Sequence, residues 1–296
     1  MKLRTRGLAC TVATTVAAAA AIGVPSATAA GVGYNSIPTS LPGNLPSLGG
    51  EAYSFGQLGN EITLAGPGPI SHVTVTLSSW ACQSGTWYNH DCVTTPGARF
   101  TEPITLYLYK APGDGSSKPG DLISSVTQTF SIPYRPSASP QCTTDGTPNG
   151  KWYDGAQGCF NGFAYNVTFT LNPHPQALPT TLVYGIGYNT SGFGSSPYGY
   201  SDPCNGTEAG CPYDSLNIAL SQDPTNVKVG SDPNPGTLWW DTSYAGFTCD
   251  NGADGTGIFR EDSPEPGDNC WGIAYQNGVS NTSTAPYYVP SVHFSS

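Results

Sequence analysis

Apolar and polar residues alternate along most of this chain, in short runs separated by clusters of Gly, Pro, Asn and Asp. An alternation of period two places every second side chain on one face of an extended backbone, so each run is typical of a half-buried β-strand. The run at 71–78 is the clearest, because Val73, Val75 and Leu77 fall on the same face. Further runs of this kind lie at 104–109, 125–132, 167–171, 182–188, 216–220 and 289–294.

Many short strands between turns predict an all-β fold, and we expect a single β-sandwich of jelly-roll type. The 37 Gly and 27 Pro residues supply the turns, while 38% hydrophobic and 11% aromatic residues distinguish the chain from a disordered one. We place the sandwich domain at 51–296, because such a length is acceptable for one all-β domain. An extended Pro- and Gly-rich lead-in at 30–50 precedes it, laid over the domain rather than built into its core.

Residues 1–29 have the pattern of a secretory signal peptide. Lys2, Arg4 and Arg6 give this segment a positively charged start. An Ala- and Val-rich apolar stretch follows at 8–24, and small residues end the segment at Ala29. Because the apolar stretch is short for a transmembrane helix, a retained membrane anchor is the weaker alternative. We therefore expect a secreted, extracellular protein that does not insert into membranes.

Cysteine spacing agrees with export. Cys10 leaves with the signal peptide, and the remaining cysteines fall in neighbouring pairs. In an exported chain they indicate disulfides, although eight cysteines allow about a hundred connectivities and a zinc site is the other interpretation. Pairing of neighbours predicts Cys82–Cys92, Cys142–Cys159, Cys204–Cys211 and Cys249–Cys270. Each disulfide would make rigid one of the long loops expected at 80–103, 133–162, 189–214 and 231–285.

An acidic composition limits the partners of the chain. It has 20 Asp and Glu against 10 Lys and Arg, which gives a net charge of −10 and a pI of about 4.5. A surface of that sign repels nucleic-acid phosphates and anionic lipid headgroups, so we expect neither as a partner. We also expect a monomer.

Aromatic residues in the predicted loops favour carbohydrate binding, with a polysaccharide or cell-wall glycan as the partner. Flat Trp and Tyr rings held at a surface stack on the apolar C–H faces of sugars and lose little side-chain entropy. Nearby Asn89, Asp91 and Asp154 would bond sugar hydroxyls. The alternative is that the rings pack against the disulfides and shield the ends of the sandwich. The candidate ligand-binding residues are Trp87, Tyr88, Trp152, Tyr153, Trp239 and Trp240, with Tyr198, Tyr200 and Tyr213 as further tyrosines.

A stretch rich in acidic residues and glycine at 250–262 could hold a structural Ca²⁺, which prefers oxygen ligands. The spacing differs from that of an EF-hand loop, because Gly252 stands where a ligand belongs. Acidic, glycine-rich turns are also common without an ion, and no other cofactor is required. The candidate metal ligands are Asp250, Asp254, Glu261 and Asp262, and Asp232 and Asp268 could reach the same site.

Motifs of nucleophilic or zinc-dependent hydrolysis are absent from the sequence. It has no Gly-x-Ser-x-Gly elbow and no His-Glu-x-x-His, and its 4 histidines are scattered, so we assign no catalytic residues. A glycoside hydrolase needs only a Glu/Asp pair at a set separation, which sequence spacing does not reveal, so an extracellular enzyme of this class is one alternative to binding. A surface or matrix protein with no small ligand is the other.

A set of stretches extends over nearly the whole mature chain: Tyr34-Asn-Ser-Ile-Pro, Ser79-Trp-Ala-Cys-Gln-Ser-Gly, Pro103-Ile-Thr-Leu, Pro119-Gly-Asp-Leu-Ile, Phe130-Ser-Ile-Pro-Tyr-Arg-Pro, Tyr184-Gly-Ile-Gly-Tyr-Asn-Thr and Tyr213-Asp-Ser-Leu-Asn. Together they resemble an exported actinobacterial family of hypothetical proteins. The pattern Ile-Thr-Leu-x-Leu-Tyr followed by Pro-Gly-x-Leu-Ile is also similar to jelly-roll modules of bacterial surface proteins. The resemblance implies a β-sandwich and carries neither an activity nor catalytic residues.

Overall fold

The computed structural model describes most of the chain that follows the predicted signal peptide. The chain divides into two compact units, Met1–Ala30 and Gly31–Ser296. The first unit, with Cys10 and the predicted signal peptide, lies outside the described residues. The described residues are 33–49, 55–87, 89–113, 119–156, 158–171, 178–188, 216–223, 225–234, 237–242, 271–275 and 287–296.

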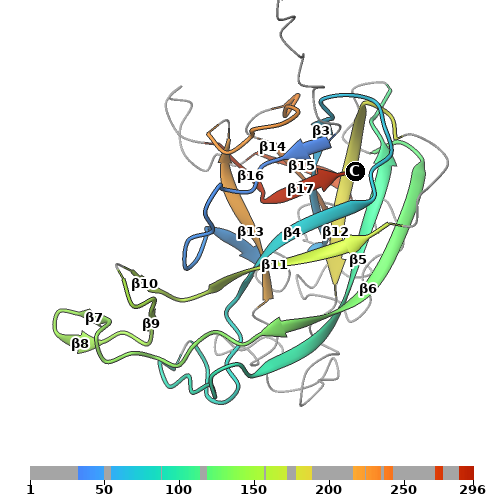
Figure 1. The fold of residues 1–296 in the computed structure, drawn as a ribbon. Helices are drawn as coiled ribbons and strands as arrows, with labels where there is room; N and C mark the ends of the chain where they lie inside the picture. Colours follow the sequence, from blue (N-terminus) through green and yellow to red (C-terminus); the bar gives the residue numbers. More distant parts are fainter. Residues whose placement is uncertain are drawn as a thin grey trace, which may run out of the picture. The chain divides into compact units, whose positions relative to one another are not determined.

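Two antiparallel sheets and two small hairpins account for all of the described strands (Figure 1). The seven-stranded sheet has the order β1 (Gly33–Asn35), β17 (Val292–Ser295), β4 (His72–Ser79), β13 (Leu216–Asp223) and β16 (Tyr287–Pro290), with β11 (Phe163–Thr170) paired to β4 and β2 (Ser47–Gly49) paired to β13. The six-stranded sheet has the order β15 (Trp271–Tyr275), β14 (Thr237–Thr242), β3 (Phe55–Thr63), β12 (Thr181–Tyr188), β5 (Arg99–Lys110) and β6 (Leu122–Pro133). The hairpins are β7 (Thr143–Thr144) with β8 (Thr147–Pro148), and β9 (Trp152–Tyr153) with β10 (Cys159–Phe160).

The all-β prediction is confirmed, because the described residues form strands and no helix. It follows that no described segment is a helix long and apolar enough to cross a membrane. All of the runs predicted from the alternation form strands, with Val73, Val75 and Leu77 fully buried in β4.

The main apolar core lies between the two large sheets, which makes the fold sandwich-like. Ring contacts join the sheets: Tyr184 of β12 lies 5.4 Å from Phe294 of β17, and Phe130 of β6 lies 4.9 Å from Phe169 of β11, centroid to centroid. Both pairs have the edge-on geometry that aromatic rings prefer. The inward side chains of β3, β4, β5, β12 and β13 fill the rest of this core.

The segment 30–50, predicted as an extended lead-in over the domain, contributes two strands of the seven-stranded sheet. β1 pairs with β17, and β2 pairs with β13. Tyr34 of β1 is fully buried in the core, and the Ser36 hydroxyl donates to the Pro290 carbonyl at 2.8 Å. These contacts fix the position of the chain that follows β1. Residues 44–47 of that chain line the candidate site described below.

The region 231–285, predicted as a long loop, contains β14 and β15, so placing Trp239 and Trp240 in a loop is wrong. β14 pairs with β3, where Trp239 lies opposite Gly59. Gly59 in turn lies opposite Gly185 of β12, and Gly185 opposite Tyr107 of β5. Trp239 belongs to a second buried cluster with Tyr107, Tyr109 and Val183.

The predicted Cys82–Cys92 and Cys142–Cys159 disulfides are both present. Disulfides persist in oxidising compartments, so they indicate an extracytoplasmic environment. The other two predicted pairs, Cys204–Cys211 and Cys249–Cys270, lie outside the described residues.

Each of these two disulfides closes an excursion from the sheets. Residues 80–98 form the first, which we call the Cys82 loop, and residues 136–162, with β7 to β10, form the second, which we call the disulfide arm. The two pack together, because Ala138 N donates to the Cys92 carbonyl and Thr94 N to the Ser137 hydroxyl, both at 2.9 Å. Each excursion therefore supports the other.

A buried cation also bridges the two excursions. Arg135, fully buried just before the disulfide arm, donates from Nη2 to the Gly150 carbonyl, and its backbone N donates to the Ala81 carbonyl at 2.9 Å. Burial lowers the pKa of the Arg135 guanidinium to about 10, which leaves it charged at neutral pH. Arg135 thus links the start of the Cys82 loop to the arm.

Candidate functional site

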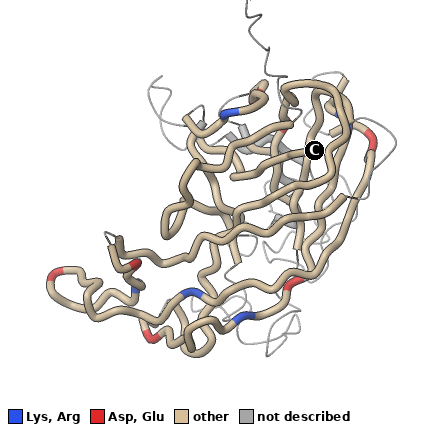
Figure 2. Tube along the Cα trace, viewed as in Figure 1, with Lys and Arg blue, Asp and Glu red and all other residues tan. Residues whose placement is uncertain are grey.

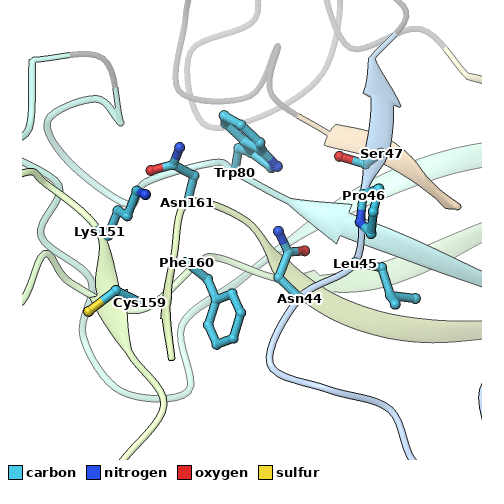
Figure 3. A pocket seen from close by; sticks show the side chains of 9 residues that line it. All are labelled: Asn44, Leu45, Pro46, Ser47, Trp80, Lys151, Cys159, Phe160 and Asn161. Atoms are coloured by element: carbon cyan, nitrogen blue, oxygen red, sulfur yellow. The ribbon is translucent and has the colours of Figure 1, made fainter. Parts of the chain in front are cut away.

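An open hollow of about 340 Å³ lies where the chain before β2, the end of β4 and the disulfide arm meet. Figure 3 shows the Trp80 indole and the Phe160 ring on opposite sides of it, with Asn161 and Lys151 to one side and Asn44 to the other. No Asp or Glu is among the described residues that line it. The lining residues are Asn44, Leu45, Pro46, Ser47, Trp80, Lys151, Cys159, Phe160 and Asn161.

Trp80 directly follows β4 and continues its outward-facing row of side chains. Its Nε1 donates to the Ser78 hydroxyl at 3.0 Å, and that hydroxyl donates to Asn44 Oδ1 at 2.7 Å. Trp87 of the Cys82 loop packs edge-on against Trp80 with 4.9 Å between ring centroids. Gly162 lies so close that a Cβ there would overlap the indole. The Trp80 ring is therefore held from three sides and is only half-buried.

Phe160 is positioned by the buried Trp152. Their ring centroids are 5.5 Å apart, and Phe160 lies opposite Trp152 in the β9–β10 hairpin. Trp152 also contacts Phe163 at 5.5 Å, which anchors the hairpin to the start of β11. Since the adjacent Cys159 is bonded to Cys142, the wall of the hollow that Phe160 forms is braced by a covalent link as well as by packing.

Several polar groups that line the hollow have no hydrogen-bond partner among the described residues. Within the described part of the chain, the Asn161 side chain forms no hydrogen bond and the Asn44 amide nitrogen donates none. The Lys151 ammonium forms no ion pair with a described residue. Aromatic faces beside unsatisfied polar groups are the usual composition of a site for a small amphipathic ligand. A sugar ring, with an apolar face and a polar edge, is such a ligand.

Two of the tryptophans predicted to bind a ligand are buried. Trp152 is 5% exposed and Trp239 is 1% exposed, so neither ring has a face at the surface. Trp152 also uses its Nε1 to donate to the Gly162 carbonyl at 2.7 Å. Both rings are therefore buried, as the alternative interpretation expects, although they pack against aromatic and apolar side chains: Trp152 against Phe160 and Phe163, Trp239 against Tyr107, Tyr109 and Val183.

The remaining predicted aromatic residues have different surroundings. Trp87 is half-buried against Trp80, and Tyr153 is 37% exposed on the disulfide arm, outside the lining of the hollow. Tyr88 and the side chain of Trp240 lie outside the described residues, as do Tyr198, Tyr200 and Tyr213.

Two of the polar residues that were predicted to bond sugar hydroxyls instead accept hydrogen bonds within turns. Asp91 Oδ1 accepts from the Thr86 backbone N at 2.8 Å, and Asp154 Oδ1 accepts from the backbone N of Ala156 at 2.9 Å. Asn89 is exposed.

Sequence reasoning missed Trp80 and Phe160. The alternation in the run 71–78 gives a signal for Trp80, because it assigns this large aromatic residue to the polar, outward face that Thr76 and Ser78 share. Phe160 has no comparable signal, since its position depends on the fold of the disulfide arm.

Most of the predicted calcium ligands, Asp250, Asp254, Glu261, Asp262 and Asp268, lie outside the described residues. Asp232 is described, and it accepts from Asn60 Nδ2 at 2.9 Å and from the Asn234 backbone N at 2.8 Å. Asn234 Nδ2 donates to Glu61 at 2.6 Å. Burial raises the pKa of the Glu61 carboxyl, and this hydrogen bond partly opposes the rise. Among the described residues no cluster of three or more His, Cys, Asp or Glu side chains could hold a metal ion.

Comparisons of the chain with models of protein families, with curated proteins and with solved structures find no match. The hollow beside the disulfide arm is thus a candidate site on its geometry alone.

Proposed function

We propose that this protein is a secreted carbohydrate-binding protein, and that a sugar ring of a polysaccharide or cell-wall glycan occupies the hollow between Trp80 and Phe160. The observation that carries the proposal is the half-buried Trp80 indole, fixed by Ser78 and Trp87 next to polar groups of Asn44 and Asn161 that the described chain leaves unsatisfied. A volume of about 340 Å³ is at the small end of the range for small-molecule sites, about 300–1,000 Å³.

Rigidity supports a binding role for this hollow. The two excursions that form it are closed by Cys82–Cys92 and Cys142–Cys159, and hydrogen bonds join one to the other. A ring that is already fixed loses little conformational freedom when a ligand stacks on it, which improves affinity without new contacts.

The proposal extends to export and topology. The charged start, apolar stretch and small residues of segment 1–29 support secretion, and the two disulfides are consistent with it. We assign the two facing antiparallel sheets to a jelly-roll-like sandwich, a class that includes lectin domains.

The burial of Trp152 and Trp239 favours a second candidate, a surface or matrix protein with no small ligand. In that case the hollow would be a gap between structural segments. The two candidates differ in whether substitution of Trp80 changes the retention of the protein on glycans.

Retention of the mature protein on insoluble cellulose, chitin and cell-wall glycan, compared with an albumin control, tests the proposal. We expect retention on at least one polymer, and we expect Trp80→Ala to weaken it about tenfold or more, as loss of a central aromatic contact does. Tyr153→Ala, which removes an exposed aromatic outside the hollow, is the matched control. Absence of binding to any glycan, acidic polymers included, would support the matrix role, and equal retention of both variants would place binding elsewhere.

A further inference from the structure

Cationic side chains are sparse in this acidic chain, as Figure 2 shows for the described trace. Each of the described cations outside the hollow is engaged by a neighbour. Lys110 pairs with Asp121 at 2.8 Å, and Lys228 donates to the Thr225 carbonyl. Arg135 is buried against the Gly150 carbonyl, as described above. Arg99 donates to Ser131 at 2.8 Å and lies 4.8 Å from the centroid of the Tyr165 ring.

Lys151 differs from them, because its ammonium has no hydrogen-bond acceptor or carboxylate among the described residues. Its backbone is nevertheless fixed. Lys151 N donates to Asn149 Oδ1 at 3.2 Å, and the Lys151 carbonyl accepts from Ser139 N at 2.8 Å. The stem of the side chain thus starts from a rigid point at the edge of β9 and reaches a hollow whose described lining has no acidic group.

The geometry points to a carboxylated sugar, a uronic acid within an anionic polysaccharide, as the ligand of the hollow; this inference rests on the proposed function. The carboxylate pairs with Lys151 Nζ while the apolar face of the ring stacks on Trp80, and Asn44 and Asn161 bond its hydroxyls. A hydrogen bond between two charged groups is roughly twice as strong as one between neutral groups. Partial enclosure by Trp80 and Phe160 reduces the screening that weakens exposed ion pairs.

The negative net charge of the chain restricts where an anionic polysaccharide can bind. A chain with 20 acidic and 10 basic residues repels a polyanion at long range, so a uronate polymer binds only where a local cation offsets the repulsion. A lysine that no described residue engages, at the edge of an aromatic hollow, is such a place. A neutral glycan would leave the Lys151 charge uncompensated and would gain only hydrogen bonds from its ammonium group.

Binding of the mature protein to polygalacturonate and to its fully methyl-esterified form tests the inference, because the two polymers share a backbone and differ in charge. We expect at least a fivefold preference for the acid form at low salt, and a smaller preference at 0.5 M NaCl, where charges are screened. Lys151→Gln is expected to remove the preference and Lys151→Arg to keep it. Lys228→Gln, the same charge change at an exposed lysine elsewhere, is expected to leave it intact.

The outcomes separate the two proposals. Equal binding of both polymers by the unmodified protein, or an unchanged preference in Lys151→Gln, overturns the uronate inference and leaves carbohydrate binding in place. Failure to bind any glycan, including the neutral polymers above, overturns both. Polyglutamate, a polyanion without sugar rings, is the last probe: binding as tight as that of polygalacturonate would show recognition of charge alone and overturn the inference.

Discussion

The Trp152 indole donates a hydrogen bond from Nε1 to the Gly162 carbonyl at 2.7 Å, and this bond ties the β9–β10 hairpin to the residue that precedes β11. Gly162 also lies against the Trp80 indole. Trp152, predicted to contact a ligand, therefore has a structural role behind the hollow: it positions Gly162, against which the Trp80 indole lies.

Substitution of Trp152 gives the first prediction. Trp152→Phe keeps an aromatic ring but leaves the Gly162 carbonyl without its donor, and we expect a loss of about 1–3 kcal/mol in the free energy of unfolding. Urea unfolding monitored by circular dichroism measures it. Tyr153→Phe, at the exposed neighbour, should stay within about 0.5 kcal/mol of the unmodified protein. Equal stability of Trp152→Phe and the unmodified protein would contradict the role of the bond.

The two disulfides give the second prediction. Their cysteines are 17 and 10 residues apart, so removal of either link by paired Cys→Ser substitution should cost about 3 kcal/mol through the entropy of the unfolded chain. The Cys142→Ser/Cys159→Ser variant should lose slightly more, because its loop is longer. Denaturant midpoints for the two paired variants measure the difference. A loss below about 1 kcal/mol in both would show that contacts between the Cys82 loop and the arm suffice to hold them.

Glu61 gives a prediction about pH. Burial raises the pKa of this carboxyl above its ordinary value of 4.5, so the folded state binds the proton more tightly than the unfolded state does. Stability therefore falls as the pH rises through the interval from 4.5 to the raised folded-state pKa, and the cost persists at neutral pH. Glu61→Gln keeps an acceptor for Asn234 and should be more stable at pH 7, with a gap that closes as the pH falls below 4.5.

Asp121 is the matched control, because its pKa is shifted in the opposite direction to that of Glu61. Its hydrogen bond and charge interaction with Lys110 lower the pKa of the Asp121 carboxyl, so this pair stabilises above the ordinary value of 3.8 and is lost as the pH falls. Asp121→Asn should thus be slightly less stable than the unmodified protein at pH 7. Thermal unfolding from pH 3 to 8 measures both, and a less stable Glu61→Gln at pH 7 would show that the carboxylate has a favourable partner.

The strands were predictable wherever one face of a strand is buried and the other is polar. β4 has this pattern, with Val73, Val75 and Leu77 inward and Thr74 in the outward row. β14 was missed because its apolar residues show no alternation: Leu238 faces the main core while Trp239 is buried on the other face of the sheet. A strand covered on both faces resembles any short apolar run.

The candidate site was less predictable, because it joins residues far apart in the chain. Asn44, Trp80 and Lys151 meet only when β4 pairs with β11 and the disulfide arm packs on the Cys82 loop. Loop aromatics are visible in the sequence, but their exposure is decided by these long-range contacts. For that reason Trp152, inside the predicted loop 133–162, is buried, whereas Trp80, at the start of the predicted loop 80–103, is half-buried.

Tyr184 gives the last prediction. It lies opposite Asn60 in the β12–β3 pair, and its hydroxyl is buried without a hydrogen bond to any described residue. Burial raises the pKa of the Tyr184 phenol well above 10, with smaller contributions from Tyr34 and Asp232, so the folded state resists ionisation that the unfolded chain undergoes. Stability consequently falls as the pH rises beyond 10, by up to about 1.4 kcal/mol per pH unit for this group.

Tyr184→Phe removes that ionisation and the desolvated hydroxyl while keeping the ring contact with Phe294. We expect it to be as stable as the unmodified protein or up to about 1 kcal/mol more stable at pH 7, with an advantage that grows above pH 10. Urea unfolding at pH 7 and pH 11 measures this, and Tyr153→Phe, at an exposed tyrosine, should show no such growth. A marked loss of stability at pH 7 would mean that the hydroxyl has a hydrogen-bond partner in the folded protein. The Asn60 side-chain amide would then be the first candidate, because Asn60 lies directly across the strand pair.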